Sequence, residues 1–200
     1  MITWTKKTVC VFFCGLLVSV SVFAMNIKGN IFVNGGFSLG TLNPSLGVID
    51  NTLFMGGRIQ ADYAINQYLS VGLETGFNSA QIGDSDFSIG VVPILARIAW
   101  HPFSLEKLDP YLVGKAGYGV GFWTNEGNDY NWSDPCGGFV WGVNLGTRFF
   151  FTKNIGCFVE AGYECQCFEW DHPGMEIGKW EDSANGRTYI TIGIALKFGN

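Results

Sequence analysis

Seven charged residues each fall on the polar side of an alternating apolar–polar segment. They are Arg58, Glu74, Arg97, Lys115, Arg148, Glu160 and Glu164. Charges gathered on one face of a sheet can pair into a closed ion network or line a hydrated path for ions. Successive segments carry Glu74 and Arg97, and also Arg148 and Glu160, so we expect the ion pairs Glu74–Arg97 and Glu160–Arg148. An unpaired buried charge is strongly destabilising, which favours the closed network; conduction is the alternative.

The cysteines predict one disulfide and no metal site. Cys136 and Cys167 come almost opposite each other if their two segments pair across a turn near Lys153. A bridge between them would suit an oxidising compartment. Cys165 and Cys167 share one strand face with no histidine near them, so we expect neither a metal nor a cofactor.

The two histidines do not predict an enzyme. His101 precedes a proline in a short turn, and His172 lies in a long connection. A serine–histidine–acid arrangement can be drawn with His172 and either Asp171 or Glu176. No nucleophile motif, phosphate loop or metal signature accompanies it, so we expect no catalytic residue.

Aromatic residues in the long connections are the candidates for binding. Aromatic side chains among polar neighbours form many binding hot spots, and they also anchor barrels at the membrane interface. The composition leaves both interpretations open. The candidates are Trp123, Tyr130, Trp132, Trp170 and Trp180.

Eight segments with a period of two follow one another from Ile27 to the end of the chain. The last is typical, with Ile190, Ile192 and Ile194 alternating with small or polar residues. The connections alternate in length. Long ones (41–51, 79–86, 124–136, 170–186) alternate with shorter ones (64–67, 101–110, 151–154). This pattern predicts an all-β fold, an eight-stranded antiparallel up-and-down transmembrane barrel with long loops at one end.

The apolar face is expected to meet lipid. The polar face is rich in glycine and carries few charges, which suits the narrow interior of an eight-stranded barrel. The apolar face is bulky, with aromatic residues toward the strand ends, as in interfacial girdles. These aromatic residues are Trp100, Tyr111, Tyr118, Phe122, Trp141 and Phe149.

The remaining composition limits location and partners. The net charge is −5, and no cluster of lysine and arginine is available for a nucleic acid. Residues 1–24 have the form of a cleavable signal peptide: Lys6 and Lys7, an apolar run, and a cleavage-like site ending at Ala24. We therefore predict residues 25–200 as the barrel domain.

Three segments resemble the small eight-stranded outer-membrane barrels, the broad group that holds OmpA transmembrane domains, OmpX, OmpW and opacity-type proteins. They are Asp109 to Gly114, the stretch from Trp141 to Tyr163, and the terminal strand from Tyr189 to Phe198. The resemblance implies an outer-membrane location in a double-membraned bacterium and contact with the barrel-insertion machinery, which reads a terminal aromatic residue. Here Phe198 is followed by two more residues, which departs from the family pattern.

The resemblance implies two functions. One is a structural or surface-interaction role, with external loops that meet a host or envelope ligand. The other is OmpW-like passage of small hydrophobic molecules through an apolar pocket near the outer rim, lined by Phe32, Phe54 and Trp123.

Overall fold

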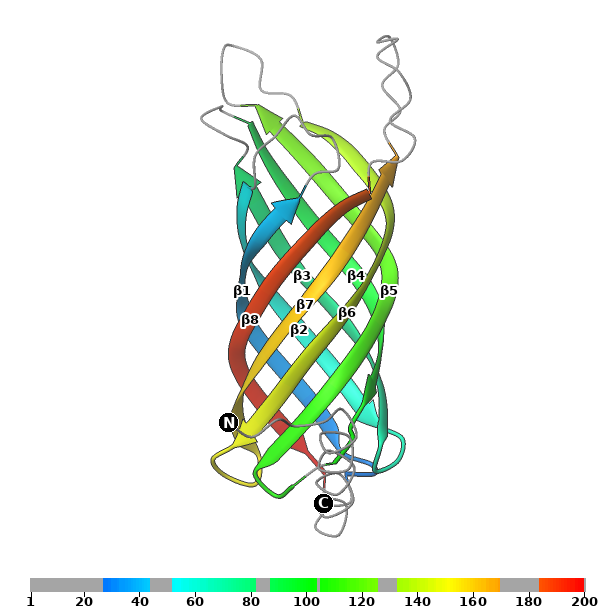
Figure 1. The fold of residues 1–200 in the computed structure, drawn as a ribbon, viewed down its shortest axis with the longest axis vertical. Helices are drawn as coiled ribbons and strands as arrows, with labels where there is room; N and C mark the ends of the chain where they lie inside the picture. The colour runs from blue at the N-terminus through cyan, green and yellow to red at the C-terminus, as the bar shows by residue number, and fades with distance from the viewer. Residues whose placement is uncertain are drawn as a thin grey trace, which may run out of the picture.

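The computed structural model describes residues 27–43, 52–81, 87–103, 105–125, 133–169 and 184–199. Each strand pairs antiparallel with the next, and the last pairs with the first, so the sheet closes into the predicted barrel (Figure 1). The all-β prediction is confirmed. The eight strands of the described part are β1 (Ile31–Asn43), β2 (Thr52–Ala64), β3 (Leu69–Gln81), β4 (Phe87–Trp100), β5 (Leu108–Asn125), β6 (Ser133–Phe150), β7 (Ile155–Glu169) and β8 (Ala184–Phe198).

Several strands extend further than the sequence predicted. β5 and β6 have 18 residues each and continue into the region 124–136, which was expected to be a long loop. Their ladder continues up to the pair Thr124 and Ser133. The alternating pattern missed these ends because glycine and polar residues replace the apolar ones there. Among the described residues, no helix is long and apolar enough to cross a bilayer.

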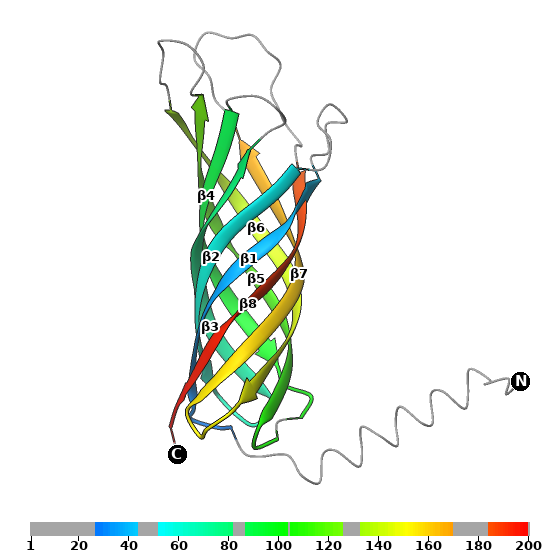
Figure 2. The same cartoon turned by 90° about the vertical axis from the view of Figure 1, so that its left-hand side faces the viewer.

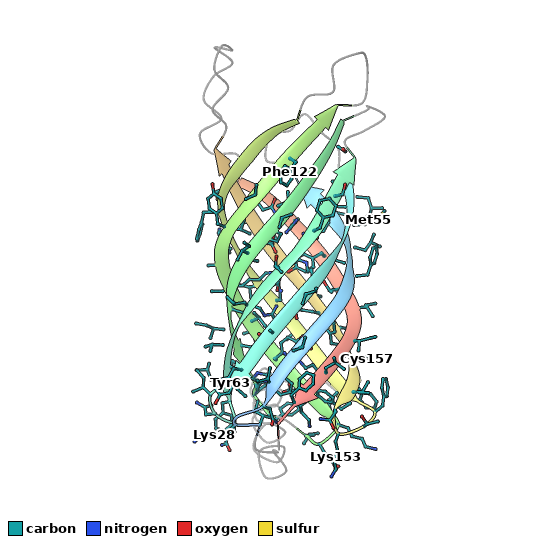
Figure 3. All side chains as sticks on the ribbon, turned by 180° about the vertical axis from the view of Figure 1, so that it is seen from behind. Lys28, Met55, Tyr63, Phe122, Lys153 and Cys157 are labelled. Atoms are coloured by element: carbon teal, nitrogen blue, oxygen red, sulfur yellow. The ribbon has the colours of Figure 1, made fainter. Side chains whose placement is uncertain are left out.

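The barrel has charged side chains inside and apolar side chains outside. On β6, Leu145 is 66% exposed while Arg148, three residues on, is fully buried. Figure 3 shows apolar side chains such as Met55 and Phe122 projecting from the outer surface. Successive strand residues point to opposite faces, so the sequence alternation directly produces this sorting. The outer surface therefore matches hydrocarbon rather than water.

Short and long connections lie at opposite ends. The turns between β2 and β3, β4 and β5, and β6 and β7 meet at the end where β1 begins and β8 finishes (Figure 2). Short turns of outer-membrane barrels face the periplasm. We call this the periplasmic end and the opposite one the outer end.

Apolar side chains close the periplasmic end from within. The turn before β1 is held by a hydrogen bond from the Gly29 amide to the Ala64 carbonyl, at 2.8 Å. This turn needs a φ of +83° at Gly29, which glycine adopts without strain. It seats Ile27 in a buried cluster inside the mouth. The members are Ile27, Phe32, Ala64, Phe150, Phe158 and Ala195.

Candidate functional site

The structure places all seven predicted charged residues in the lumen. Each is 5% exposed or less. They come from six strands, and each points inward because it has the same parity as its buried strand neighbours. They form one continuous network, and three further charged residues, Asp62, Asp109 and Arg187, belong to it.

The periplasmic part of the network is built around Arg148 of β6. Its Nη2 donates to Asp62 Oδ2 at 2.6 Å, and its Nη1 donates to Asp109 Oδ2 at 2.9 Å. The guanidinium lies 4.4 Å from the ring centroids of both Phe32 and Tyr111. Arg148 is therefore fixed by two ion pairs and by cation–π contacts.

The central part is built around Glu74 of β3. Its Oε1 accepts from Arg58 Nη1 at 2.5 Å and from Lys115 Nζ at 2.7 Å, and its Oε2 accepts from Arg97. One carboxylate thus holds cations from β2, β4 and β5. Arg97 continues to Glu160 Oε2 at 3.2 Å, which links this group to the far wall. The predicted pair Glu74–Arg97 is present.

Glu164 of β7 organises the outer part. Its Oε2 lies 3.1 Å from Arg58 Nη1 and 2.9 Å from Lys115 Nζ, and its Oε1 accepts from Arg187. The Tyr189 hydroxyl accepts from Lys115 Nζ at 2.6 Å, and its ring lies under Arg58, 4.0 Å from Cζ. The outer part therefore combines ion pairs with an aromatic wall.

Charges within the network balance. Five cations face five carboxylates, and every one takes part in an ion pair within the described part of the chain. Buried charges remain ionised at low cost only when they are paired and hydrogen-bonded. A balanced network of this kind fills and crosslinks the lumen. The cations are Arg58, Arg97, Lys115, Arg148 and Arg187, and the carboxylates are Asp62, Glu74, Asp109, Glu160 and Glu164.

The predicted pair Glu160–Arg148 is wrong. The β6–β7 register sets Glu160 opposite Gly146 and Arg148 opposite Phe158, so the two lie diagonally. Glu160 instead accepts from Asn144 Nδ2 at 2.6 Å and from Arg97 across the lumen. In a narrow barrel, a long side chain reaches the opposite wall as easily as the adjacent strand.

A serine–histidine–aspartate chain occurs at the periplasmic end, where the sequence did not predict one. Ser70 Oγ lies 3.0 Å from His101 Nε2, and His101 Nδ1 lies 2.8 Å from Asp109 Oδ1. Ser70 and His101 are fully buried, and the Phe32 and Tyr111 rings pack against the imidazole. The order of contacts matches that of a catalytic triad, but both the serine and the histidine are enclosed by neighbouring side chains.

The register behind the predicted disulfide is wrong. Cys167 is a free, exposed thiol, and Phe139, not Cys136, is its neighbour on β6. The pairing is offset by three residues because β6 and β7 meet in a tight turn that sets Phe150 opposite Gly156. The side chain of Cys136 lies outside the described residues.

Most of the predicted binding residues cannot be placed. Tyr130, Trp132, Trp170 and Trp180 lie outside the described residues. Trp123 belongs to β5 rather than to a loop, and its backbone pairs with Ile89 and Asp134.

The predicted apolar pocket is not formed as expected, because its residues lie at opposite ends of the lumen. Phe32 pairs with Asp62 at the periplasmic end, whereas Phe54 packs against Tyr189 near the outer end. The pattern identified which face each residue occupies but not its height in the barrel.

Tyr111 corrects the prediction of an outward aromatic girdle. It is 1% exposed and lies inside, where its ring occupies the space that a Cβ at Gly146 would need. Pro110 was taken as a turn residue, but it belongs to β5. Every second residue of β5 points inward, so counting back from Lys115 through Val113 places Tyr111 and Asp109 inside. The same alternation, continued along β4 and β8, places His101 and Arg187 inside the barrel.

The chemistry available to this network is structural. Most of its donors and acceptors form hydrogen bonds with one another. No group of three or more metal-ligating side chains occurs among the described residues. The lumen is therefore a polar core, enclosed by a sheet whose outer face is apolar. This combination defines a lipid-embedded, side-chain-filled β-barrel.

Comparison with known proteins agrees with this class. Residues 10–198 match the family described as the outer membrane protein beta-barrel domain, and the chain belongs to that family. It is an outer-membrane protein surrounded by membrane lipid. A search of curated proteins found no match.

Solved structures share the fold. Neisserial surface protein A is 15% identical, with a TM-score of 0.60 over 86% of this chain and 100% of its own. OprG from Pseudomonas aeruginosa is 12% identical, with a TM-score of 0.56 over 86% and 97%. Ail, the attachment invasion locus protein of Yersinia pestis, is 15% identical, with a TM-score of 0.51 over 86% and 99%. At these identities the likeness concerns the fold alone.

Proposed function

We propose that this protein is a closed structural barrel that acts through its outer end, as a surface-interaction protein rather than as a pore or an enzyme. The balanced network is the observation that carries the proposal. Arg58, Arg97 and Arg148 are each 1% exposed or less, so the lumen interior is occupied by paired side chains. A barrel filled in this way presents its end connections to the outside.

Charge favours one class of partner. The segments that join strands at the outer end carry nine carboxylates and a single lysine, Lys179. A surface of this sign favours a cationic partner and repels a sulfated polyanion. Ail of Yersinia pestis has been solved with the heparin analogue sucrose octasulfate, and we expect this chain to differ from it. The carboxylates are Asp50, Asp84, Asp86, Glu126, Asp129, Asp171, Glu176, Glu181 and Asp182.

A binding assay tests this proposal directly. The barrel from Met25 onward is refolded, immobilised in lipid nanodiscs, and exposed in parallel to polylysine and to heparin. We expect salt-sensitive binding of polylysine and none of heparin. A variant with Asp171, Glu176, Glu181 and Asp182 changed to the corresponding amides should bind less polylysine. Heparin binding by the unchanged protein would contradict the proposal.

Passage of small hydrophobic molecules is the alternative, and it requires an apolar lining that continues from the outer end. Phe54, Ala80 and Tyr189 form a small buried cluster near that end. Arg58 lies against the Tyr189 ring of this cluster and is paired with Glu164, so an apolar solute would have to displace these charged side chains. Uptake of an apolar fluorescent dye by vesicles containing the barrel, above that of empty vesicles, would favour this alternative.

A further inference from the structure

The rim at the periplasmic end carries an excess of exposed positive charge. Among its described residues, three lysines are exposed and a single carboxylate, Glu106, is exposed with them. Lys28 precedes β1, Lys107 lies in the β4–β5 turn, and Lys153 lies in the β6–β7 turn. The three lysines are thus distributed around the barrel rather than gathered in one patch.

The rim also ends in a belt of exposed aromatic side chains. Trp100 is 51% exposed and Phe151 is 62% exposed, and the Phe149 and Phe151 rings pack edge to face with centroids 5.5 Å apart. Figure 3 shows Lys28 and Lys153 on opposite sides of the same end, with Lys28 beside Tyr63. Aromatic belts of this kind mark the level of the lipid headgroups. The ammonium groups therefore lie at or just beyond that level.

Among the residues that the structure describes, no ion pair joins Lys107 or Lys153 to a carboxylate. The five cations and five carboxylates of the lumen network balance one another, so this network does not neutralise the rim. An ammonium group at headgroup depth is complementary to a phosphate, which it binds as a point charge.

We propose that Lys28, Lys107 and Lys153 form a binding rim for anionic phospholipid headgroups of the periplasmic leaflet. Each lysine near an anionic membrane surface contributes about fivefold to the binding equilibrium. The rim therefore gives the barrel a preference for anionic lipid at this end, while the carboxylates of the outer end give the opposite preference there. The carboxylate-bearing peptidoglycan of the periplasm is the rival partner. It is disfavoured because the lysines are spread around the rim and do not line one common groove.

The test compares barrel stability in phosphatidylcholine vesicles with and without added phosphatidylglycerol. Unfolding equilibria are measured for the barrel from Met25 onward and for the triple variant Lys28→Gln, Lys107→Gln, Lys153→Gln. The matched control is Lys179→Gln, the same chemical change in the connection between β7 and β8. Phosphatidylglycerol should lower the unfolding constant of the unchanged protein. We expect this lowering to be smaller by a factor of about ten or more in the triple variant, and to be unchanged in the control.

Salt provides a second measurement that needs no variant. High salt screens exposed charges. At high salt, phosphatidylglycerol should therefore stabilise the unchanged protein no more than it stabilises the triple variant. An equal phosphatidylglycerol effect in the triple variant and the unchanged protein would overturn the proposal. Lysine-dependent sedimentation with isolated peptidoglycan, together with an unchanged lipid effect, would overturn it in favour of the rival.

Discussion

Arg148 Nη2 donates to Asp62 Oδ2 at 2.6 Å, although the two residues come from strands on different sides of the barrel. The same guanidinium bonds Asp109 of β5. One side chain of β6 thus ties together β2 and β5 across the lumen, which backbone pairing between adjacent strands cannot do. Crosslinks of this kind hold the barrel interior together.

Loss of Arg148 should therefore be severe. Arg148→Ala leaves Asp62 with one cationic partner, Arg97, and removes the ion pair of Asp109 with an arginine. We expect the free energy of unfolding to fall by about 3–5 kcal/mol, because the buried network is left with four cations for five carboxylates. Urea unfolding in detergent micelles, followed by tryptophan fluorescence, measures the change.

The matched control is Lys153→Ala, which removes an exposed cation from the turn that follows β6. It should change stability in micelles by less than about 0.5 kcal/mol. An Arg148 variant that unfolds at the same urea concentration as the unchanged protein would contradict a structural role for the network.

Replacing Asn78 by an apolar residue should stabilise the barrel. It is 2% exposed, and within the described part of the chain neither its amide nitrogen nor its amide oxygen has a hydrogen-bond partner. A buried unsatisfied amide costs about 1–3 kcal/mol, so Asn78→Leu, which keeps the branching of the side chain but is larger, should raise the free energy of unfolding by about 1 kcal/mol. Destabilisation in the same urea assay would show that the amide has a partner.

Sequence alternation predicted the topology well because its period of two directly determines which face each side chain occupies. It correctly placed Arg58, Glu74 and Glu164 inside. It failed at Tyr111 and His101, where a neighbouring proline or a turn residue interrupted the alternation. Partners across the lumen could not be predicted, since the contact of Arg148 with Asp62 depends on strand stagger and side-chain length.

The strand register is tested by thiol chemistry. Cys167 is exposed, whereas Cys165 is 5% exposed. We expect a maleimide reagent to label Cys167 rapidly and Cys165 slowly in folded protein, and both at the same rate after unfolding. Peptide mass mapping without reductant should find Cys167 as a free thiol. Recovery of a Cys136–Cys167 bridged peptide would require another register between β6 and β7.

The serine–histidine–aspartate chain should be chemically silent. Ser70 is fully buried inside the periplasmic end of the barrel, so we expect a fluorophosphonate probe not to reach its Oγ. Folded protein should remain unlabelled at Ser70, as judged by mass spectrometry. Ser70→Ala provides the control for labelling elsewhere on the chain. Probe attached to Ser70 in the unchanged, folded barrel would mean that this end opens and that an enzymatic role must be considered.

The central claim is that the ion network closes the lumen, and planar-bilayer conductance tests it most directly. The barrel from Met25 onward is refolded, inserted into a lipid bilayer, and recorded under an applied voltage. A lumen filled by five cations and five carboxylates that pair with one another should give a folded barrel without discrete current steps. Reproducible steps of uniform size from folded protein would contradict the claim and show that the network is a hydrated path for ions.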